Sequence, residues 1–212
     1  TNFANYFGKM YQPRYLSGLA AGAMTDSNKI GYVAAFPIPE VIRGINAFAA
    51  GVNEVNPDAT VEVVWTFTWF GPEAETQAAN ALLETGADVL AQHQDSAATG
   101  LAAEAAGAKW ISYNTAYGQD SAPEAFVTAP VWDWGPYYVD IVESIIDETF
   151  TTESYWGGME TGLVSLYDLS SDVPSETATL IAEKTEAIIN GTLEVAIVEE
   201  EFISNVIGTV NP

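Results

Sequence analysis

The feature that most limits how this chain can fold is a regular alternation between short apolar runs and longer amphipathic stretches. The run "KIGYVAAF" at 29–36 follows polar residues and predicts a buried strand. From Pro39 the apolar residues recur every three or four positions, which is the spacing of one helix face, and a proline in the first helical turn loses no hydrogen bond. The β-branched and aromatic run at 60–70 predicts a second strand. These stretches form a strand–helix–strand unit.

The same alternation continues along the rest of the chain. Further helices, marked by proline or acidic residues at their starts or glycine at their ends, are predicted at 72–86, 95–107, 133–150 and 174–191. Further strands are predicted at 87–93, 109–114 and 125–131, with a short strand or turn at 162–170. Strands that alternate with helices over this length form a parallel sheet with helices on both faces, so the predicted fold class is α/β.

The segment around the helix at 133–150 carries two specific expectations. Trp132 and Trp134 alternate along an extended chain and should share one face, with Asp133 on the other. Within the helix, helical spacing places one apolar set on a single face that is expected to turn inward: Tyr138, Ile141, Val142, Ile145 and Ile146.

The charge balance excludes several function classes. The chain has 29 acidic against 6 basic residues, a net charge of -23, so it lacks the basic patch that binds nucleic acid phosphates or an anionic membrane. Its 48% hydrophobic content and six tryptophans argue against disorder. Scattered carboxylates on a folded body indicate a protein adapted to high salt, where ions screen the self-repulsion; an acidic protein from another habitat remains the alternative.

Familiar enzyme motifs are absent from the sequence. It contains no cysteine, which excludes disulfides, thiol nucleophiles and thiolate metal sites. No GxSxG, Walker or GxGxxG motif and no calcium-binding loop occurs, and a single histidine makes a zinc site atypical. We therefore predict no catalytic residue, no metal and no cofactor, although a carboxylate pair for glycoside hydrolysis remains open among the acids.

A candidate ligand site follows from the predicted topology, because ligands of open α/β sheets bind beyond the carboxyl ends of the strands. Aromatic side chains, amides and carboxylates follow these strand ends, a combination that suits a flat small molecule with hydrogen-bonding edges. The candidate ligand-binding residues are Phe36, Trp69, Phe70, His93, Gln94, Asp95, Asn114, Trp132 and Asp133.

Several of these residues have purely structural alternatives. Trp69 and Phe70 could pack in the core, because strand ends are often half-buried. His93 could be a buried histidine that satisfies its own hydrogen bonds. Asp95, or Ser96 beside it, could cap the following helix.

Longer strings now suggest a family. "NKIGYVAAFPIPEVIRGINAFAAGVNEVNPDATVEVVWTFTWF", "ETGADVLAQHQDS", "VWDWGPYYVDIVESIIDETF" and "YWGGMETGLVSL" occur in this order, preceded by "NYFGKMYQPRYLSGLAAGAMT". Over about residues 1–170 the chain resembles the basic membrane protein (BMP) family of substrate-binding lipoproteins, which serve ABC transporters and include purine nucleoside receptors. The resemblance implies a type I periplasmic-binding-protein fold, in which two α/β lobes joined by crossing strands clamp a ligand.

In this chain the resemblance implies one complete lobe plus part of a second. Residues 1–28 would be the remainder of an N-terminal lobe, and 29–131 the C-terminal lobe. Residues 132–154 would be a helix that returns to the N-terminal lobe, and 155–212 a return to the C-terminal lobe and a tail, with the crossing near 155–160. The tail after Gly191 does not resemble the usual ending of the family.

The resemblance also implies a ligand and a location. Trp69 and Phe70 match the aromatic stacking corner of the family, His93 to Asp95 and Asn114 match loops after two strands, and Trp132 and Asp133 match a hinge-side loop. Nucleoside receptors carry a basic residue for the sugar in that loop and this chain does not, which favours a free purine base or another planar ligand over a nucleoside.

The implied protein is non-enzymatic and extracytoplasmic, with an ABC permease as its partner. It would reach the membrane only through a lipid anchor on a cysteine that this chain lacks. Two other functions remain open: a structural or interaction protein at the cell surface that reuses the lobe, and a sensory receptor domain. A hydrolase is less favoured because the motifs are missing.

Overall fold

A parallel sheet forms the centre of the larger part of the molecule, the body. The computed structural model describes residues 2–200 and the backbone of 207–209, and within these the sheet has six strands in the order β10-β3-β2-β4-β5-β6. The strands are β2 (Lys29–Ala34), β3 (Thr60–Trp65), β4 (Val89–Gln92), β5 (Lys109–Ile111), β6 (Phe126–Thr128) and β10 (Ile207–Thr209). Every neighbouring pair is parallel, as the alternating sequence predicts.

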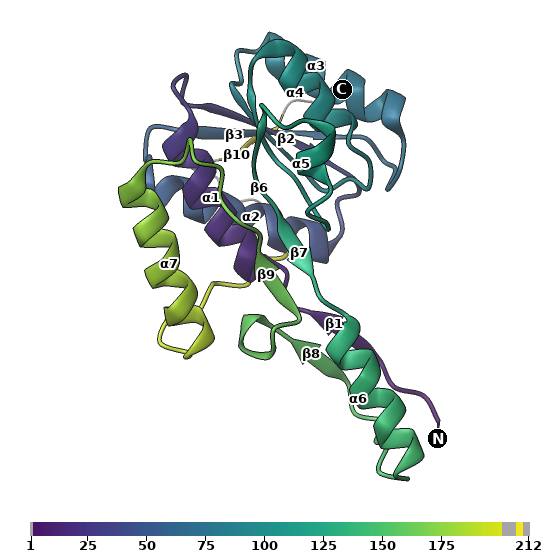
Figure 1. Cartoon of the computed structure of the whole chain (residues 1–212). Helices are drawn as coiled ribbons and strands as arrows, with labels where there is room; N and C mark the ends of the chain where they lie inside the picture. Colours follow the sequence, from purple (N-terminus) through teal and green to yellow (C-terminus); the bar gives the residue numbers. More distant parts are fainter. Residues whose placement is uncertain (1, 201–206, 210–212) are drawn as a thin grey trace.

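Helices cover both faces of this sheet (Figure 1). One face carries α1 (Tyr11–Met24) and α2 (Pro39–Val55), with α7 (Ser175–Ile189) beside α1; the other carries α3 (Pro72–Glu84), α4 (Ala98–Ala106) and the short α5 (Gly118–Ser121).

Two separate cores result from the alternation of side chains along each strand. On β2, Tyr32 packs into the core under α1 and α2, whereas the next residue, Val33, packs into the core under α3 and α4. On β5, Trp110 and Ile111 divide in the same way. A sheet buried on both faces explains why its strands read as continuous apolar runs.

Several predicted boundaries are wrong at the carboxyl ends of the strands. The second strand ends at Trp65 instead of residue 70, because Phe67 takes a left-handed backbone conformation with φ 55° that no strand can continue. Strand β5 ends at Ile111, and the segment predicted as one strand at 125–131 is divided between β6 and β7 (Pro130–Trp132). These shortened strands leave longer loops at the edge where the candidate site lies.

A second, smaller part projects from the body as an arm (Figure 1). It contains a parallel pair formed by β1 (Tyr6–Gly8) and β8 (Tyr155–Gly157), and the helix α6 (Gly135–Ile146). The antiparallel pair of β7 with β9 (Val164–Leu166) and a 3₁₀ turn, η1 (Met159–Thr161), link this arm to the body.

The predicted inward face of α6 is exposed, which corrects the expectation for Tyr138, Val142, Ile145 and Ile146. Their exposed fractions run from 49% for Tyr138 to 72% for Ile146, and only Ile141 is half-buried. Tyr137 is the buried residue of this helix instead, with its ring 4.5 Å from that of Tyr155. The amphipathic pattern identified the helix correctly, but the described part of the chain leaves its apolar face uncovered.

The arm is too small to be an independent domain. A two-stranded sheet has little stability by itself, and a parallel pair normally lies inside a larger sheet. The body, in contrast, has a complete sheet covered on both faces. The described residues therefore form one complete α/β lobe and part of a second, as predicted. None of the described helices has both the length and the apolar content that crossing a bilayer requires.

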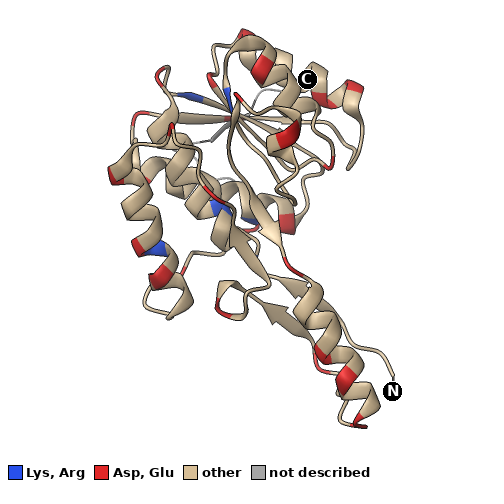
Figure 2. Ribbon diagram, viewed as in Figure 1, with Lys and Arg blue, Asp and Glu red and all other residues tan. Residues whose placement is uncertain are grey.

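Acidic residues are scattered over both the body and the arm, whereas basic ones are few (Figure 2). Four of the six bases form ion pairs with acids of the chain: Lys9 with Glu160, Arg43 with Glu199, Lys109 with Asp172 and Lys184 with Glu54. Lys29 donates to the carbonyl of Thr85, and Arg14 is fully buried. Every base is therefore already engaged within the folded chain or buried in it.

Close contact between α1 and α2 depends on glycine, and this gives a stability prediction. A Cβ at Gly18 would overlap the carbonyl oxygen of Phe48 in α2, which is backbone and cannot move aside. We expect Gly18→Ala to lower the free energy of unfolding by at least about 1 kcal/mol, measured by urea denaturation.

Gly44→Ala in α2 is the matched control for this substitution. The nearest atom to a Cβ there is Arg14 Nε, at 3.7 Å, so this variant should be neutral or gain up to about 1 kcal/mol of helix propensity. Equal stability changes in the two variants would contradict the packing argument.

Candidate functional site

A cleft of about 330 Å³ lies at the carboxyl ends of the strands, where the body meets the arm. The loops after β3, β4 and β5, the start of α2, and residues of β1 and β7 contribute to it. Its lining residues are Phe7, Glu40, Trp69, His93, Asp95, Tyr113, Asn114, Trp132 and Trp134. We call this site the cleft.

Five of the nine sequence-predicted site residues line the cleft together: Trp69, His93, Asp95, Asn114 and Trp132. They come from four different loops and strands, so the topological argument that grouped them placed them at one edge of the sheet. Their contact with a ligand remains a prediction.

The other four predicted residues lie outside the lining of the cleft. Phe36 stands behind Trp69, with ring centroids 5.2 Å apart. Phe70 is 64% exposed, and Gln94 is buried beside the neighbouring pocket described below. Asp133 Oδ1 accepts a hydrogen bond of 3.1 Å from the backbone N–H of Gly135. Of these four, only Phe36 directly supports a residue of the cleft.

One wall of the cleft is a stack of two indoles. The Trp132 and Trp134 rings lie 4.9 Å apart and within 15° of parallel, so the prediction that they share a face is confirmed. Phe7 packs edge-on against Trp132 at 5.5 Å, which joins the arm to this wall. A rigid aromatic surface of this kind suits a planar ring.

A chain of side-chain hydrogen bonds connects this wall to Asp95. Trp132 Nε1 donates to Asn114 Oδ1 over 2.9 Å, and Asn114 Nδ2 donates to Asp95 Oδ1 over 2.7 Å. Asn114 holds a left-handed backbone with φ 67°, a conformation that asparagine tolerates better than most residues. The network fixes the Asp95 carboxylate at the cleft.

The helix-cap interpretation of Asp95 is wrong. Helix α4 starts at Ala98, and Ser96 Oγ accepts the backbone N–H of Ala98 at 3.2 Å. Asp95 is instead tied to the loop after β3, because its own N–H donates to the carbonyl of Trp69 over 3.0 Å. Trp69 is 42% exposed, so it is not a core residue either. Both side chains line the cleft.

The floor of the cleft is a buried ionic cluster that sequence reasoning did not find. His93 Nε2 lies 3.2 Å from Glu40 Oε2; the His93 side chain is 3% exposed and that of Glu40 is 22% exposed. Beneath them Arg14 is fully buried, with its guanidinium carbon 3.8 Å from the centre of the Tyr113 ring. Arg14 Nη1 donates to the carbonyl of Gln92 over 2.7 Å.

The missed cleft residues are Phe7, Glu40, Tyr113 and Trp134. Glu40 had a usable signal, because it follows Pro39 at the corner where a strand end meets a helix N-terminus. Trp134 was grouped with Trp132 but not assigned to the site. Phe7 lies on a strand whose partner is about 150 residues away, and nothing local in the sequence indicates that pairing.

The cluster perturbs the pKa values of its two titratable members. Burial alone would raise the pKa of Glu40, but the contact with His93 and the charges of Arg14 and Arg43 outweigh burial and hold this pKa below its usual value. Burial and the Arg14 charge lower the pKa of His93, and the carboxylates of Glu40 and Asp95 do not cancel that effect. At neutral pH a neutral His93 therefore faces an ionised Glu40.

These shifts predict loss of stability in acid. His93 is the only histidine, and its lowered pKa means that the unfolded chain takes up a proton below about pH 6.5 more readily than the folded one. The contribution of neutral His93 to the free energy of unfolding is complete above that pH. As the pH falls, this contribution declines by up to about 1.4 kcal/mol per pH unit. Glu40 adds a second decline below its usual value of 4.5. Urea denaturation at a series of pH values measures both.

The variant His93→Gln isolates the contribution of the histidine. It should show a flatter dependence of unfolding free energy on pH than the wild type between about pH 6.5 and 5, because the remaining titrating groups are the same in both proteins. Parallel curves for the two proteins would contradict the predicted shift.

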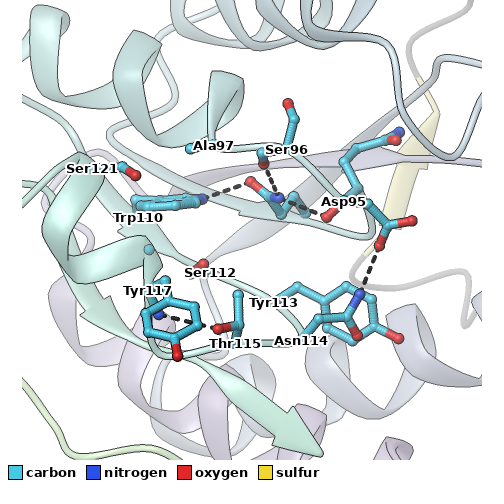
Figure 3. A pocket seen from close by; sticks show the side chains of 13 residues that line it. Asp95, Ser96, Ala97, Trp110, Ser112, Tyr113, Asn114, Thr115, Tyr117 and Ser121 are labelled. Atoms are coloured by element: carbon cyan, nitrogen blue, oxygen red, sulfur yellow. Dashed lines mark hydrogen bonds between the residues drawn. The ribbon is translucent and has the colours of Figure 1, made fainter.

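A second, smaller pocket of about 160 Å³ adjoins the cleft behind Asn114 (Figure 3). Trp110 Nε1 donates to Gln92 Oε1 over 2.9 Å, and Gln92 Nε2 in turn donates to the carbonyls of Gln94 and Ser96. The figure shows the Asn114 amide directed at Asp95, so these two residues separate this side pocket from the cleft. Within the described residues, no group of His, Asp and Glu side chains could hold a metal ion.

Comparison with known proteins gives a consistent result. A family model described as "ABC transporter substrate-binding protein PnrA-like" matches residues 1–199, a longer stretch than the approximate range 1–170 over which the sequence resembles the family. A putative ABC transporter glucose-binding protein of Haloferax volcanii is 45% identical over 194 residues, which cover 92% of this chain and 49% of that protein. A purine-binding protein of Brucella abortus is 39% identical over 193 residues, which cover 89% of this chain and 53% of that protein.

The solved structure of an ABC transporter solute-binding protein from Conexibacter woesei superimposes with a TM-score of 0.75 at 24% identity, over 91% of this chain and 65% of that one. This likeness concerns the fold alone. The chain spans about half the length of the curated relatives it matches.

Proposed function

The chain belongs to the PnrA-like family of ABC transporter substrate-binding proteins, and on this premise we propose that the cleft binds a purine base or nucleoside-like ligand for an ABC importer. The predicted BMP-family membership and periplasmic-binding-protein fold are confirmed by the family match and the solved relative. One observation carries the ligand proposal: the cleft joins stacked indoles to hydrogen-bonding side chains that are already fixed. Preorganised side chains lower the ordering cost of binding.

The side chains of the cleft favour a free base over a nucleotide. Trp69 and the stacked pair of Trp132 and Trp134 line the cleft with aromatic surface, and Asp95 and Asn114 offer polar groups to the edge of a ring. All six bases of the chain are buried or engaged elsewhere, so none is available to a phosphate group. Asp133, matched to the hinge-side loop of the family, accepts a hydrogen bond from the backbone N–H of Gly135 and does not line the cleft.

A sugar is the second candidate ligand. The relative from Haloferax volcanii that is 45% identical carries the name of a glucose-binding protein. Hydroxyl groups donate hydrogen bonds to carboxylates, so Glu40 and Asp95 could also accept from a hexose.

Native mass spectrometry of the purified protein, followed by calorimetric titration with purine bases, nucleosides and glucose, tests the proposal. We expect a co-purified or titrated purine to bind with a Kd of micromolar or below, equivalent to about 8 kcal/mol or more. Binding of glucose with no binding of any purine would replace the first candidate by the second. Binding of neither would favour a structural or interaction protein that reuses the fold.

The arm is proposed to belong to an N-terminal lobe that closes on the body over the ligand. In this assignment β1, α6 and β8 belong to that lobe, whereas α1, the central sheet with its helices and α7 belong to the C-terminal lobe. Residues 1–28 and 155–212, each expected to lie in one lobe, are therefore divided between the two. The uncovered apolar face of α6 and the isolated β1–β8 pair support it, because both are surfaces on which a larger lobe would pack. The tail beyond residue 200 lies largely outside the described residues.

The proposed setting is extracytoplasmic, with an ABC permease as partner and a lipid anchor outside this chain as the link to the membrane. The net charge of -23, with acidic residues on both the body and the arm, supports a further proposal that the protein works at high salt (Figure 2). Screening by salt weakens the mutual repulsion of those carboxylates.

A further inference from the structure

We propose that Glu40 determines which ligand the cleft selects, by accepting hydrogen bonds from amino groups on the edge of a planar ring. This inference rests on the proposed function, because it assumes that a purine-like ligand enters the cleft. It adds a specificity-determining residue that sequence reasoning did not include, and a chemical class: uncharged amino-substituted rings, with anionic ligands rejected.

Geometry leaves Glu40 available to a ligand. It is the second residue of α2, directly after Pro39, and its side chain lines the cleft with 22% of its surface exposed. Oε2 is the oxygen paired with His93 at 3.2 Å. Among the described residues no partner bonds to the other oxygen, so Oε1 can accept from a ligand.

The surroundings of Glu40 keep this acceptor charged. The start of α2 favours negative charge through its free backbone N–H groups. His93 donates to the carboxylate, and the buried guanidinium of Arg14 lies in the layer beneath, against the ring of Tyr113. His93, Arg14 and Arg43 together hold the pKa of Glu40 below its usual value although the side chain is largely buried. Arg14 and His93 are therefore positioning residues, which hold Glu40 ionised and oriented.

Buried polar atoms without hydrogen-bond partners lie near the cleft and support the positioning role of Arg14 and His93. Arg14 Nε and Nη2, Tyr32 Oη and His93 Nδ1 are buried without a hydrogen-bond partner among the described residues. A chain tolerates such groups more readily at functional sites than in an ordinary core. Arg14 forms no direct ion pair among the described residues, and its charge stabilises the ionised form of Glu40.

Charge in the rest of the cleft gives the ligand class. Asp95 supplies a second carboxylate, with only one of its oxygens bonded to Asn114. No base lines the cleft other than His93, which is neutral at neutral pH. Ionised carboxylates accept hydrogen bonds and cannot donate them, and they repel anions. A matching ligand therefore brings N–H donors and no negative charge, as amino-substituted purines do.

Two pairs of compounds that each differ by a single amino group test the inference: guanosine with inosine, and adenine with purine. Calorimetric titration of each pair against the wild type gives a ratio of Kd values for the amino group. Glu40→Gln keeps the size of the side chain but removes the charge. We expect it to reduce the preference for the amino compound roughly 10- to 100-fold, the range for a hydrogen bond to a charged group, in at least one pair.

Glu73→Gln is the matched control. Glu73 directly follows Pro72 at the start of α3, as Glu40 follows Pro39 in α2, and it is exposed and does not line the cleft. Glu73→Gln removes the same charge from the same helical position. It should leave the ratio of Kd values in each pair of compounds as it is in the wild type. Binding of inosine or purine, the compounds without the amino group, shows that the cleft of each variant is intact.

The outcomes separate the two proposals. If purines bind the wild type and the ratios in Glu40→Gln equal those in Glu73→Gln, the role of Glu40 is wrong while the proposed function stands. If no purine binds the wild type, both proposals fall. If Glu40→Gln does not fold, the variant Glu40→Asp replaces it, because its shorter side chain keeps the charge but holds it farther from the ligand. A reduced preference for the amino compound then supports the proposal, and an unchanged preference overturns it.

Discussion

Replacing Trp110 with alanine should lower the free energy of unfolding by about 3–5 kcal/mol. Trp110 is 1% exposed, packs between α4 and Phe126, and fills the space that Gly100 leaves open. Its Nε1 also donates to Gln92, so the substitution leaves a cavity and an unpaired buried amide oxygen at once. Both costs fall in the core that supports the loops of the cleft.

Trp69→Ala is the matched control for stability. Trp69 is also an indole near the carboxyl ends of the strands, but it is 42% exposed and lies in a loop. Its removal should change the free energy of unfolding much less than that of Trp110. Urea denaturation of both variants at one salt concentration measures the difference, and equal losses would contradict the expectation that the buried indole contributes more to stability than the exposed one.

Trp69→Ala should, however, weaken binding of a purine by about 1–3 kcal/mol, or roughly 5- to 150-fold in Kd, if the indole stacks on the ligand. The ring lines the cleft and is supported from behind by Phe36 at 5.2 Å, so it can meet a ligand without reorganising. Calorimetric titration with the best-binding purine measures the effect.

Trp156→Ala is the control for this binding experiment. Trp156 has the same exposed fraction, 42%, but lies on β8 and does not line the cleft. Its substitution should leave the affinity unchanged. An affinity of Trp69→Ala equal to that of the wild type would remove Trp69 from the ligand site.

Much of the site could be predicted because local patterns identify the strands, even though several strands end earlier than predicted. The apolar runs identified the strands of a parallel sheet, and parallel strands bring their carboxyl ends to one edge. That single rule grouped Trp69, His93, Asp95, Asn114 and Trp132 across more than sixty residues of sequence. The rule could not show which of the neighbouring side chains face the cleft. For that reason the predicted site also included Phe70, Gln94 and Asp133, which do not line the cleft.

The ionic floor of the cleft could not be predicted in the same way. Arg14, Glu40 and His93 come from α1, the start of α2 and the loop after β4, and their contact depends on how these elements pack. Taken singly, each has an ordinary interpretation: a helix surface charge, a first-turn acid and a buried histidine. Only their mutual positions make a carboxylate that is ionised, oriented and open to the cleft.

By itself, the sequence determined the α/β class, the helices on both faces, the edge of the sheet at which the cleft lies and the acidic composition. Those properties follow from spacing and composition, which are local. The tertiary structure decided that Asp95 is bonded to Asn114 instead of capping a helix, that the apolar face of α6 is exposed and that Phe7 joins the cleft. Each of these depends on contacts between residues distant in the chain, whose register and packing no local pattern specifies.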